Sequence, residues 1–158
     1  MNQSSPPCAV HPPHPGLRPS LGMQLTLVRS EIVRAIEADV AAQGLELSFT
    51  QCLILKRLAR SGPMSASELA RAVDLDGGAM TRQLDHLQHK GYLTRQPHAQ
   101  DRRALRIELT DEGVSAWQQV NRCNERVLAS AQRTLSKAEQ QQLTDYLDRV
   151  LHALRDKS

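Results

Sequence analysis

The spacing of apolar residues predicts a chain built mainly of helices. From residue 21 onward, apolar positions recur every three or four residues, which is the period of one helical face. The pattern predicts helices over residues 21–44, 48–61, 65–73, 78–90, 110–134 and from 136 to about 156. The second helix begins with Ser48 or Thr50 as its N-cap, and Gly62 and Pro63 end it.

Capping patterns and apolar faces support these boundaries. Ser65 with Glu68 and Ser136 with Glu139 have the spacing of capping boxes, in which each end of the pair bonds the other's backbone. Residues 74–78 read as a turn, and Gly91 ends the helix that follows it. The side chains expected to face the core in these helices are Leu53, Ile54, Leu58, Ala59, Leu69, Ala70, Val73, Met80, Leu84 and Leu87.

Residues 92–109 follow a different period. Leu105, Ile107 and Leu109 alternate with polar residues, and this period of two predicts a strand. Residues 92–96 are its expected partner, and the polar, basic segment 97–103 lies between them. We therefore expect a β-hairpin with a projecting basic tip.

The order of these elements predicts a mainly α fold, a winged helix-turn-helix domain at residues 48–109 with a two-stranded β-wing. The helix-turn-helix covers about 65–90 and the wing about 92–109, with flanking helices at 21–44 and 110–156. In such a domain the second helix can enter the DNA major groove while the first supports it. Residues 1–20 hold six of the eight prolines and are predicted to be a disordered tail.

The positive charge is concentrated where that topology would place DNA. Residues 77–106 hold six Lys or Arg against two Asp, whereas the segments on either side are close to neutral. A local excess of this kind is typical of a polyanion-binding surface. We find no apolar run long enough for a membrane span, no secretory signal and no catalytic or metal-binding motif. These observations predict a cytoplasmic protein that has no cofactor and is not an enzyme.

The outer helices predict a homodimer. Segments 21–44 and 110–156 carry apolar faces, and leaving such faces in water costs roughly 25 cal/mol per Å². Packing them across a two-fold axis would bury them. A dimer would also present two recognition helices about 34–36 Å apart, which suits a pseudo-palindromic DNA site.

One stretch of the chain resembles a known family. Asp101-Arg-Arg103, followed by Leu105, Ile107, Leu109-Thr110 and Gly113, is similar to the wing signature of MarR (multiple antibiotic resistance regulator) proteins. Residues 78–87 resemble the recognition helix of that family, and the likeness covers about 21–156. It implies a transcription regulator, expected to be a repressor. A small phenolic or anionic ligand would bind between the winged domain and the dimerisation helices and release the DNA.

The resemblance also implies roles for the wing residues. Arg103 matches the wing arginine that enters the minor groove, where a narrow groove concentrates negative potential. Asp101 matches the acid that orients this arginine. Arg102 and Arg106 are expected phosphate contacts, with simple solvation as the alternative.

The recognition helix carries the other candidate DNA contacts. Thr81 and Arg82 lie early on its polar side, and arginine is the commonest reader of guanine. Gly78 and Ala79 would let the helix N-terminus approach a phosphate. The other expected phosphate contacts are His86, one turn further along, and Ser65, for which helix capping is the alternative.

Two other interpretations remain open. A thiol-switched regulator of the same fold would use Cys52, expected to be a small buried residue, and Cys123, expected between packed and solvent-facing positions. The other interpretation is a winged-helix protein-interaction adapter that has lost DNA binding. The presence of Arg82, Asp101 and Arg103 argues against this adapter. His86 and His89 have a spacing that could hold a metal ion, but no acidic or cysteine cluster accompanies them.

Overall fold

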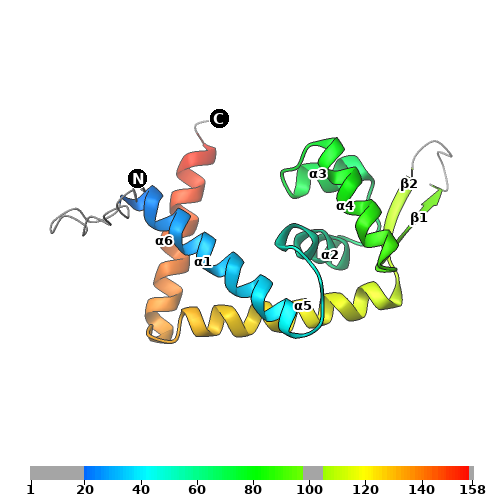
Figure 1. Ribbon diagram of the computed structural model, residues 1–158. Coiled ribbons are helices and arrows are strands. Elements are labelled where there is room, and N and C mark those ends of the chain that lie inside the picture. The colour runs from blue at the N-terminus through cyan, green and yellow to red at the C-terminus, as the bar shows by residue number, and fades with distance from the viewer. Residues whose placement is uncertain (1–19, 98–104, 157–158) are drawn as a thin grey trace, which may run out of the picture.

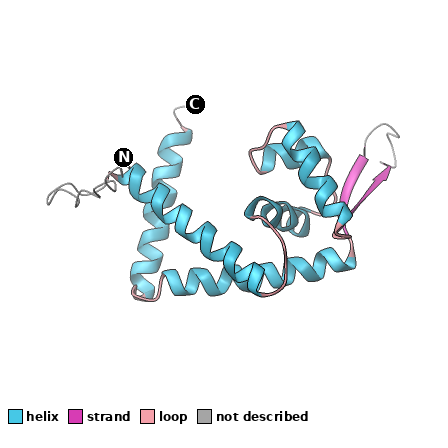
Figure 2. Cartoon of the chain, in the orientation of Figure 1, coloured by secondary structure: helices cyan, strands magenta, loops and turns pink. Residues whose placement is uncertain are grey.

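The computed structural model describes residues 20–97 and 105–156 and shows a mainly α winged helix-turn-helix fold, as predicted. Figures 1 and 2 show a helical body with one hairpin at its edge. Over these residues the elements are α1 (Leu21–Ala42), α2 (Phe49–Ser61), α3 (Ala66–Ala72), α4 (Gly77–His89), β1 (Leu93–Pro97), β2 (Leu105–Leu109), α5 (Asp111–Ala131) and α6 (Lys137–Arg155).

Side-chain caps explain where the helices begin. Both predicted capping boxes form, at Ser65 with Glu68 and at Ser136 with Glu139. Of the two alternatives for α2, Ser48 is the N-cap, and Gln51 completes a third capping box. Each box satisfies two backbone N–H groups at a helix end. These short-range bonds are the reason that the pattern located the helices well.

Several helix ends differ from the prediction by one to three residues, and α1 ends at Ala42 rather than at residue 44. α4 begins at Gly77 rather than Gly78, because Asp76 is its N-cap and accepts a hydrogen bond from the Ala79 N–H at 2.8 Å. The turn before it passes through Asp74 in the left-handed region, with φ of 56°. α5 ends at Ala131, three residues before the expected end at Thr134, and a short turn leads into α6.

One continuous apolar core joins the winged domain to the flanking helices. Met80, Leu84 and Leu87 of α4 are buried as predicted. In α2, however, Leu55 is buried and Ala59 is exposed, so the buried face is rotated from the predicted one. The core residues are Ile36, Val40, Leu45, Leu47, Cys52, Ile54, Leu55, Leu58, Leu69, Ala70, Met80, Leu84, Leu87, Leu93, Ile107, Ala116, Val120 and Cys123.

α5 lies along one side of this core and packs against both α1 and α2 (Figure 1). It buries Ala116, Val120 and Cys123, which belong to the same core cluster as Ile36 and Val40 of α1. The expectation that Cys123 lies between packed and solvent-facing positions is wrong, because its side chain is fully buried. The flanking helices are therefore part of the support of the winged domain.

The wing is an antiparallel pair that starts at Leu93, one residue later than predicted. Leu93 pairs with Leu109 and Pro97 pairs with Leu105. A third extended segment, which the sequence did not indicate, joins the pair through a bridge between Met64 and Ile107. The Met64 N–H bonds the Ile107 carbonyl at 3.0 Å, and the Ile107 N–H bonds the Met64 carbonyl at 2.8 Å. This bridge ties the connection between α2 and α3 to the wing.

Thr110 and Gly113 contact the residues that precede β1 and so position the start of α5 beside the wing. The Thr110 hydroxyl donates to the Gly91 carbonyl at 2.6 Å and accepts from the Gly113 N–H at 3.0 Å. A Cβ atom added to Gly113 would lie 1.8 Å from the Tyr92 carbonyl oxygen, so only glycine fits there. This part of the motif therefore has a packing role.

α6 and the first half of α1 contrast with the rest of the fold. α6 buries none of its residues, and Leu151 and Leu154 are exposed. In α1, Met23, Leu27 and Val28 are also exposed. Figure 1 shows both segments on the side of the molecule away from the wing. No helix of the described residues is long and apolar enough to cross a membrane.

Candidate nucleic-acid interface

The helix-turn-helix is formed by α3 and α4, which pack on each other through apolar side chains. Leu69 of α3 and Met80, Leu84 and Leu87 of α4 are fully or almost fully buried. The opposite side of α4 is polar and exposed. It carries the predicted contacts Thr81, Arg82 and His86, so the structure brings these three side chains to one accessible helix face.

The N-terminus of α4 is partly capped from within. The Asp76 carboxylate accepts a hydrogen bond from the Ala79 N–H. Ala79 is one of the two residues that were expected to let this helix end approach a phosphate. Gly77 and Gly78 are exposed, and N–H groups in a first helical turn have no partner in the helix. The Thr81 hydroxyl donates to the Gly77 carbonyl at 2.9 Å. A phosphate at this end would meet Gly77 and Gly78 beside a negative charge.

An ion pair connects the recognition helix to the wing. Arg95 of β1 and Asp85 of α4 form a salt bridge of 2.6 Å. The side chain of Arg95 is 27% exposed and that of Asp85 is 54% exposed, so water screens the pair only in part. The pair links β1 to α4 directly. The predicted wing-tip residues Asp101, Arg102 and Arg103 lie outside the described residues.

Arg106 has a different environment from the one expected of a phosphate contact. Its guanidinium group donates a hydrogen bond to the Pro63 carbonyl, and its Nε atom is buried without a hydrogen-bond partner in the described structure. The side chain therefore faces the connection between α2 and α3. This arrangement supports the same junction as the Met64 bridge.

The hydroxyl of Ser65 is occupied by helix capping. Its Oγ accepts from the Glu68 N–H at 3.3 Å and donates to the Glu68 carboxylate at 2.9 Å. Hydrogen bonds from the Ser65 N–H and hydroxyl are the main reason that the pKa of Glu68 is lowered, and the charges of Arg106 and Arg71 add to the effect. These bonds favour the capping interpretation of Ser65 over a phosphate contact.

Both cysteines of the thiol-switch interpretation are buried and protonated at neutral pH. Burial, together with the charge of Glu37, raises the pKa of Cys52 to about 12. Burial and a hydrogen bond to Asp39 raise the pKa of Cys123, and Arg126 opposes this in part. Since the thiolate is the reactive form, neither group is activated for oxidation.

A small cavity lies between the winged domain and the flanking helices. It measures about 110 Å³ and is lined by residues of α1, α2 and α5. Phe49 and Trp117 supply aromatic surface, and Lys56 and Asn124 supply the polar groups. The apolar pattern did not single out these residues as a site, because the cavity forms only where three separate helices meet.

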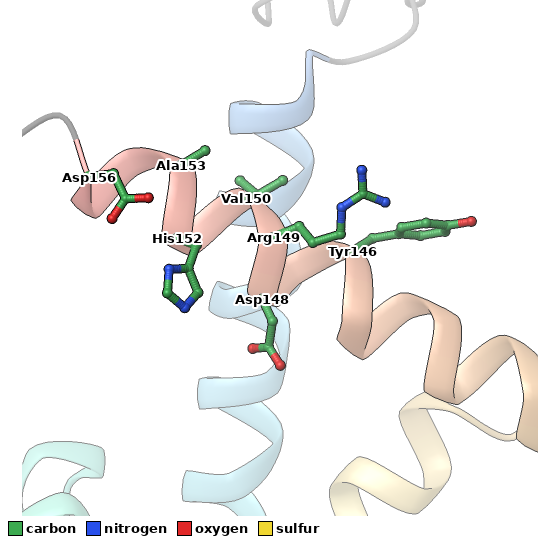
Figure 3. Close-up of a pocket in the computed structure, with 7 residues that line it drawn as sticks. All are labelled: Tyr146, Asp148, Arg149, Val150, His152, Ala153 and Asp156. Carbon is green, nitrogen blue, oxygen red and sulfur yellow. The ribbon is translucent and has the colours of Figure 1, made fainter.

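A larger hollow of about 790 Å³ lies along α6 but is open and lined by that helix alone. Figure 3 shows Tyr146, Arg149 and His152 projecting from the same helix, with no second element enclosing them. We therefore interpret it as the free face of α6. Among the described residues, no group of three His, Cys, Asp or Glu side chains is placed to hold a metal ion.

Comparison with known proteins agrees with this geometry. Residues 47–105, which span α2 to the start of β2, match the MarR family. This segment of the chain is therefore similar in sequence to the MarR family. Its relative the multiple antibiotic resistance protein MarR of Salmonella typhimurium is 31% identical over 93 residues. That alignment spans 59% of this chain and 62% of the relative, so less than two thirds of the relative's length is matched.

Solved structures show that the MarR fold extends beyond the matched segment. A cysteine-to-serine mutant of E. coli MarR, complexed with operator DNA, superimposes with a TM-score of 0.74 and 24% identity. It covers 83% of this chain and 93% of that chain. The PcaV regulator of Streptomyces coelicolor, in complex with its natural ligand, gives a TM-score of 0.71 and 20% identity over 85% of this chain and 94% of that one.

Proposed function

We propose that this chain is a homodimeric transcription regulator of the MarR family that binds a pseudo-palindromic DNA operator. The observation that carries the proposal is the polar face of α4, where Thr81, Arg82 and His86 are exposed together on a helix held by the core. The operator-bound E. coli MarR structure, which has the same fold, supports it. The positive charge of residues 77–106 supplies the attraction to phosphates.

Within this proposal, Arg82 and Thr81 contact bases and Arg103 enters the minor groove. Arginine can bond guanine O6 and N7 at once, which gives sequence discrimination. Asp101 orients Arg103, and Arg102 binds phosphate at the wing tip. The ion pair between Asp85 and Arg95 joins the wing to α4 and adds to the apolar packing that aligns both contacts with DNA.

The exposed apolar faces support the homodimer. Met23, Leu27 and Val28 of α1 and Leu151 and Leu154 of α6 contact little of their own chain. A second copy would bury these faces and would place two α4 helices on one side of the DNA.

The cavity between α1, α2 and α5 supports a small-molecule effector. Its aromatic walls and Lys56 suit a phenolic or anionic ligand, and PcaV, which has the same fold, is known in complex with a natural ligand. A ligand there would change the position of the winged domain relative to α1 and α5. If it binds the DNA-free arrangement more tightly, it releases the operator and acts as an inducer of a repressor.

The two alternatives receive less support. The raised pKa of both Cys52 and Cys123 argues against a thiol switch. The exposed arginine on α4 and the operator-bound relative argue against a protein-interaction adapter.

The proposal is tested by fluorescence anisotropy on duplexes tiled across the region upstream of the protein's own gene, with a scrambled duplex as control. We expect one duplex to bind at least about a thousandfold more tightly than the control at fixed salt. Arg82→Ala and Arg103→Ala should each weaken this binding at least tenfold. Arg122→Ala, which removes an exposed arginine of α5, is the matched control and should bind normally.

The other outcomes are equally informative. Equal, salt-sensitive binding to every duplex would indicate a non-specific DNA-binding protein, and absence of binding would favour the adapter. Specific binding that survives both arginine substitutions would contradict the assigned residues.

A further inference from the structure

Two hollows lie next to each other along α2, and together we call them the α2 cleft. The first is the cavity of about 110 Å³ among α1, α2 and α5, and the second, of about 170 Å³, lies between α2 and the end of α3. Leu53 and Lys56 line both hollows, so these two side chains mark the junction. A ligand that lies across this junction would contact both hollows.

The first hollow has the size and surface of a site for one aromatic ring. Phe49 and Trp117 face it from α2 and α5, and Ile32 and Ile36 face it from α1. A cavity of about 150 Å³ lined by apolar side chains is known to hold benzene, so the smaller volume of this hollow, about 110 Å³, limits a ligand there to one aromatic ring.

The second hollow is basic. Lys56, Arg57 and Arg60 line it, and no carboxylate lines either hollow. None of these three cations has a carboxylate within ion-pair distance among the described residues. Lys56 and Arg60 are one helical turn apart, which places their charges on the same side of α2. The guanidinium group forms paired hydrogen bonds with phosphate oxygens, and three neighbouring cations match a dianion better than a monoanion.

We propose that this cleft binds an aryl phosphate, a single-ring aromatic compound that carries a phosphate or diphosphate group. The ring lies between Phe49 and Trp117, and the phosphate lies at Lys56 and along Arg57 and Arg60. This inference names a ligand class for the proposed effector site. It rests on the proposed function only where it expects the bound ligand to release DNA. Ligand binding itself does not depend on that function.

Calorimetry with the full-length protein tests the proposal with four probes. These are phenyl phosphate, benzoate, benzyl alcohol and inorganic phosphate. Phenyl phosphate should bind at least tenfold more tightly than each of the other three, since it alone has both the ring and the dianion. It should also change the fluorescence of Trp117, which is the protein's single tryptophan.

Variants separate the two parts of the cleft. Arg57→Gln combined with Arg60→Gln should weaken phenyl phosphate at least tenfold and change benzoate less than twofold. The pair Arg122→Gln and Arg133→Gln removes the same charge from exposed positions outside the cleft and should leave phenyl phosphate binding unchanged. All four arginines are exposed, so these variants should fold.

Several results would overturn the proposal. They are binding of phenyl phosphate no tighter than that of inorganic phosphate or benzoate, an equal loss in both double variants, and an unchanged tryptophan spectrum on saturation. If the Arg57 and Arg60 substitutions weaken operator binding but not phenyl phosphate binding, these cations are DNA contacts and the aryl phosphate site is wrong. Tight phenyl phosphate binding by a protein that binds no DNA would refute the proposed function and leave this inference standing.

Discussion

The winged half of the molecule buries side chains in every element, whereas α6 buries none. From α2 to β2, each helix and strand contributes at least one residue to the core, and Leu69 is 0% exposed. At the other end, Leu154 of α6 is 64% exposed and Met23 of α1 is 55% exposed. Both regions have regular helices with good caps, so capping alone does not produce a packed structure. The apolar side chains of the winged half are buried within their own chain. In our proposal, a second copy of the chain buries those of α6 and the first half of α1.

The largest expected effect tests the closure of the winged half. Gly113→Ala places a methyl group 1.8 Å from the Tyr92 carbonyl oxygen, and the clash should reduce the free energy of unfolding by about 3 kcal/mol. Urea denaturation measures it. The control is Gly22→Ala in α1, where no atom lies within 4 Å and the change should stay below about 1 kcal/mol. Equal effects at both positions would mean that the two regions are packed alike.

The second prediction concerns the open half. Leu151→Glu adds a carboxylate to the face proposed to be buried in the dimer, and the dimer dissociation constant should rise at least about 100-fold because burying an unpaired charge is costly. Analytical ultracentrifugation measures the constant. Leu105→Glu alters a similarly exposed leucine on the wing and should leave the dimer intact. A Leu151→Glu protein that dimerises normally would disprove this use of α6.

A third, smaller effect reports burial inside the core. The pKa of Cys52 is raised from 9.0 to about 12, so the folded state favours the neutral thiol. The associated stability is fully present below pH 9 and is lost as the pH rises from 9 towards 12, with about 1 kcal/mol lost at pH 10. Urea unfolding at pH 8, 9 and 10 should show a shallower pH dependence in Cys52→Ala than in the unchanged protein. The same slope in both would place Cys52 in contact with water.

The smallest effect concerns the link between wing and recognition helix. A double-mutant cycle with Asp85→Asn and Arg95→Gln should give a coupling free energy of about 0.5 kcal/mol, the size typical of partly exposed pairs. The coupling should shrink at 1 M salt as the charges are screened. Zero coupling at low salt would show that apolar contacts alone set the wing against α4.

The sequence by itself determined the features that depend on neighbours within one helical turn or one strand pair. Capping residues such as Ser65 and Ser136 located helix starts, and the alternation around Ile107 located the wing. The regular spacing of Met80, Leu84 and Leu87 was enough to separate the buried face of the recognition helix from its polar face. Such signals are local, because capping bonds and helix periodicity join residues three or four positions apart.

Only the tertiary structure decided the features in which distant segments meet. Cys123 is buried because α1 and α2 pack over α5, and Arg106 turns to Pro63, 43 residues earlier in the chain. The cleft along α2 requires Phe49 and Trp117 to come together from separate helices. A helical period states which side of a helix is apolar but not which other helix covers it. Which helix covers a given apolar face depends on how all the helices pack together. An apolar face can be covered by any of several helices, and the arrangement that fills the core decides between them.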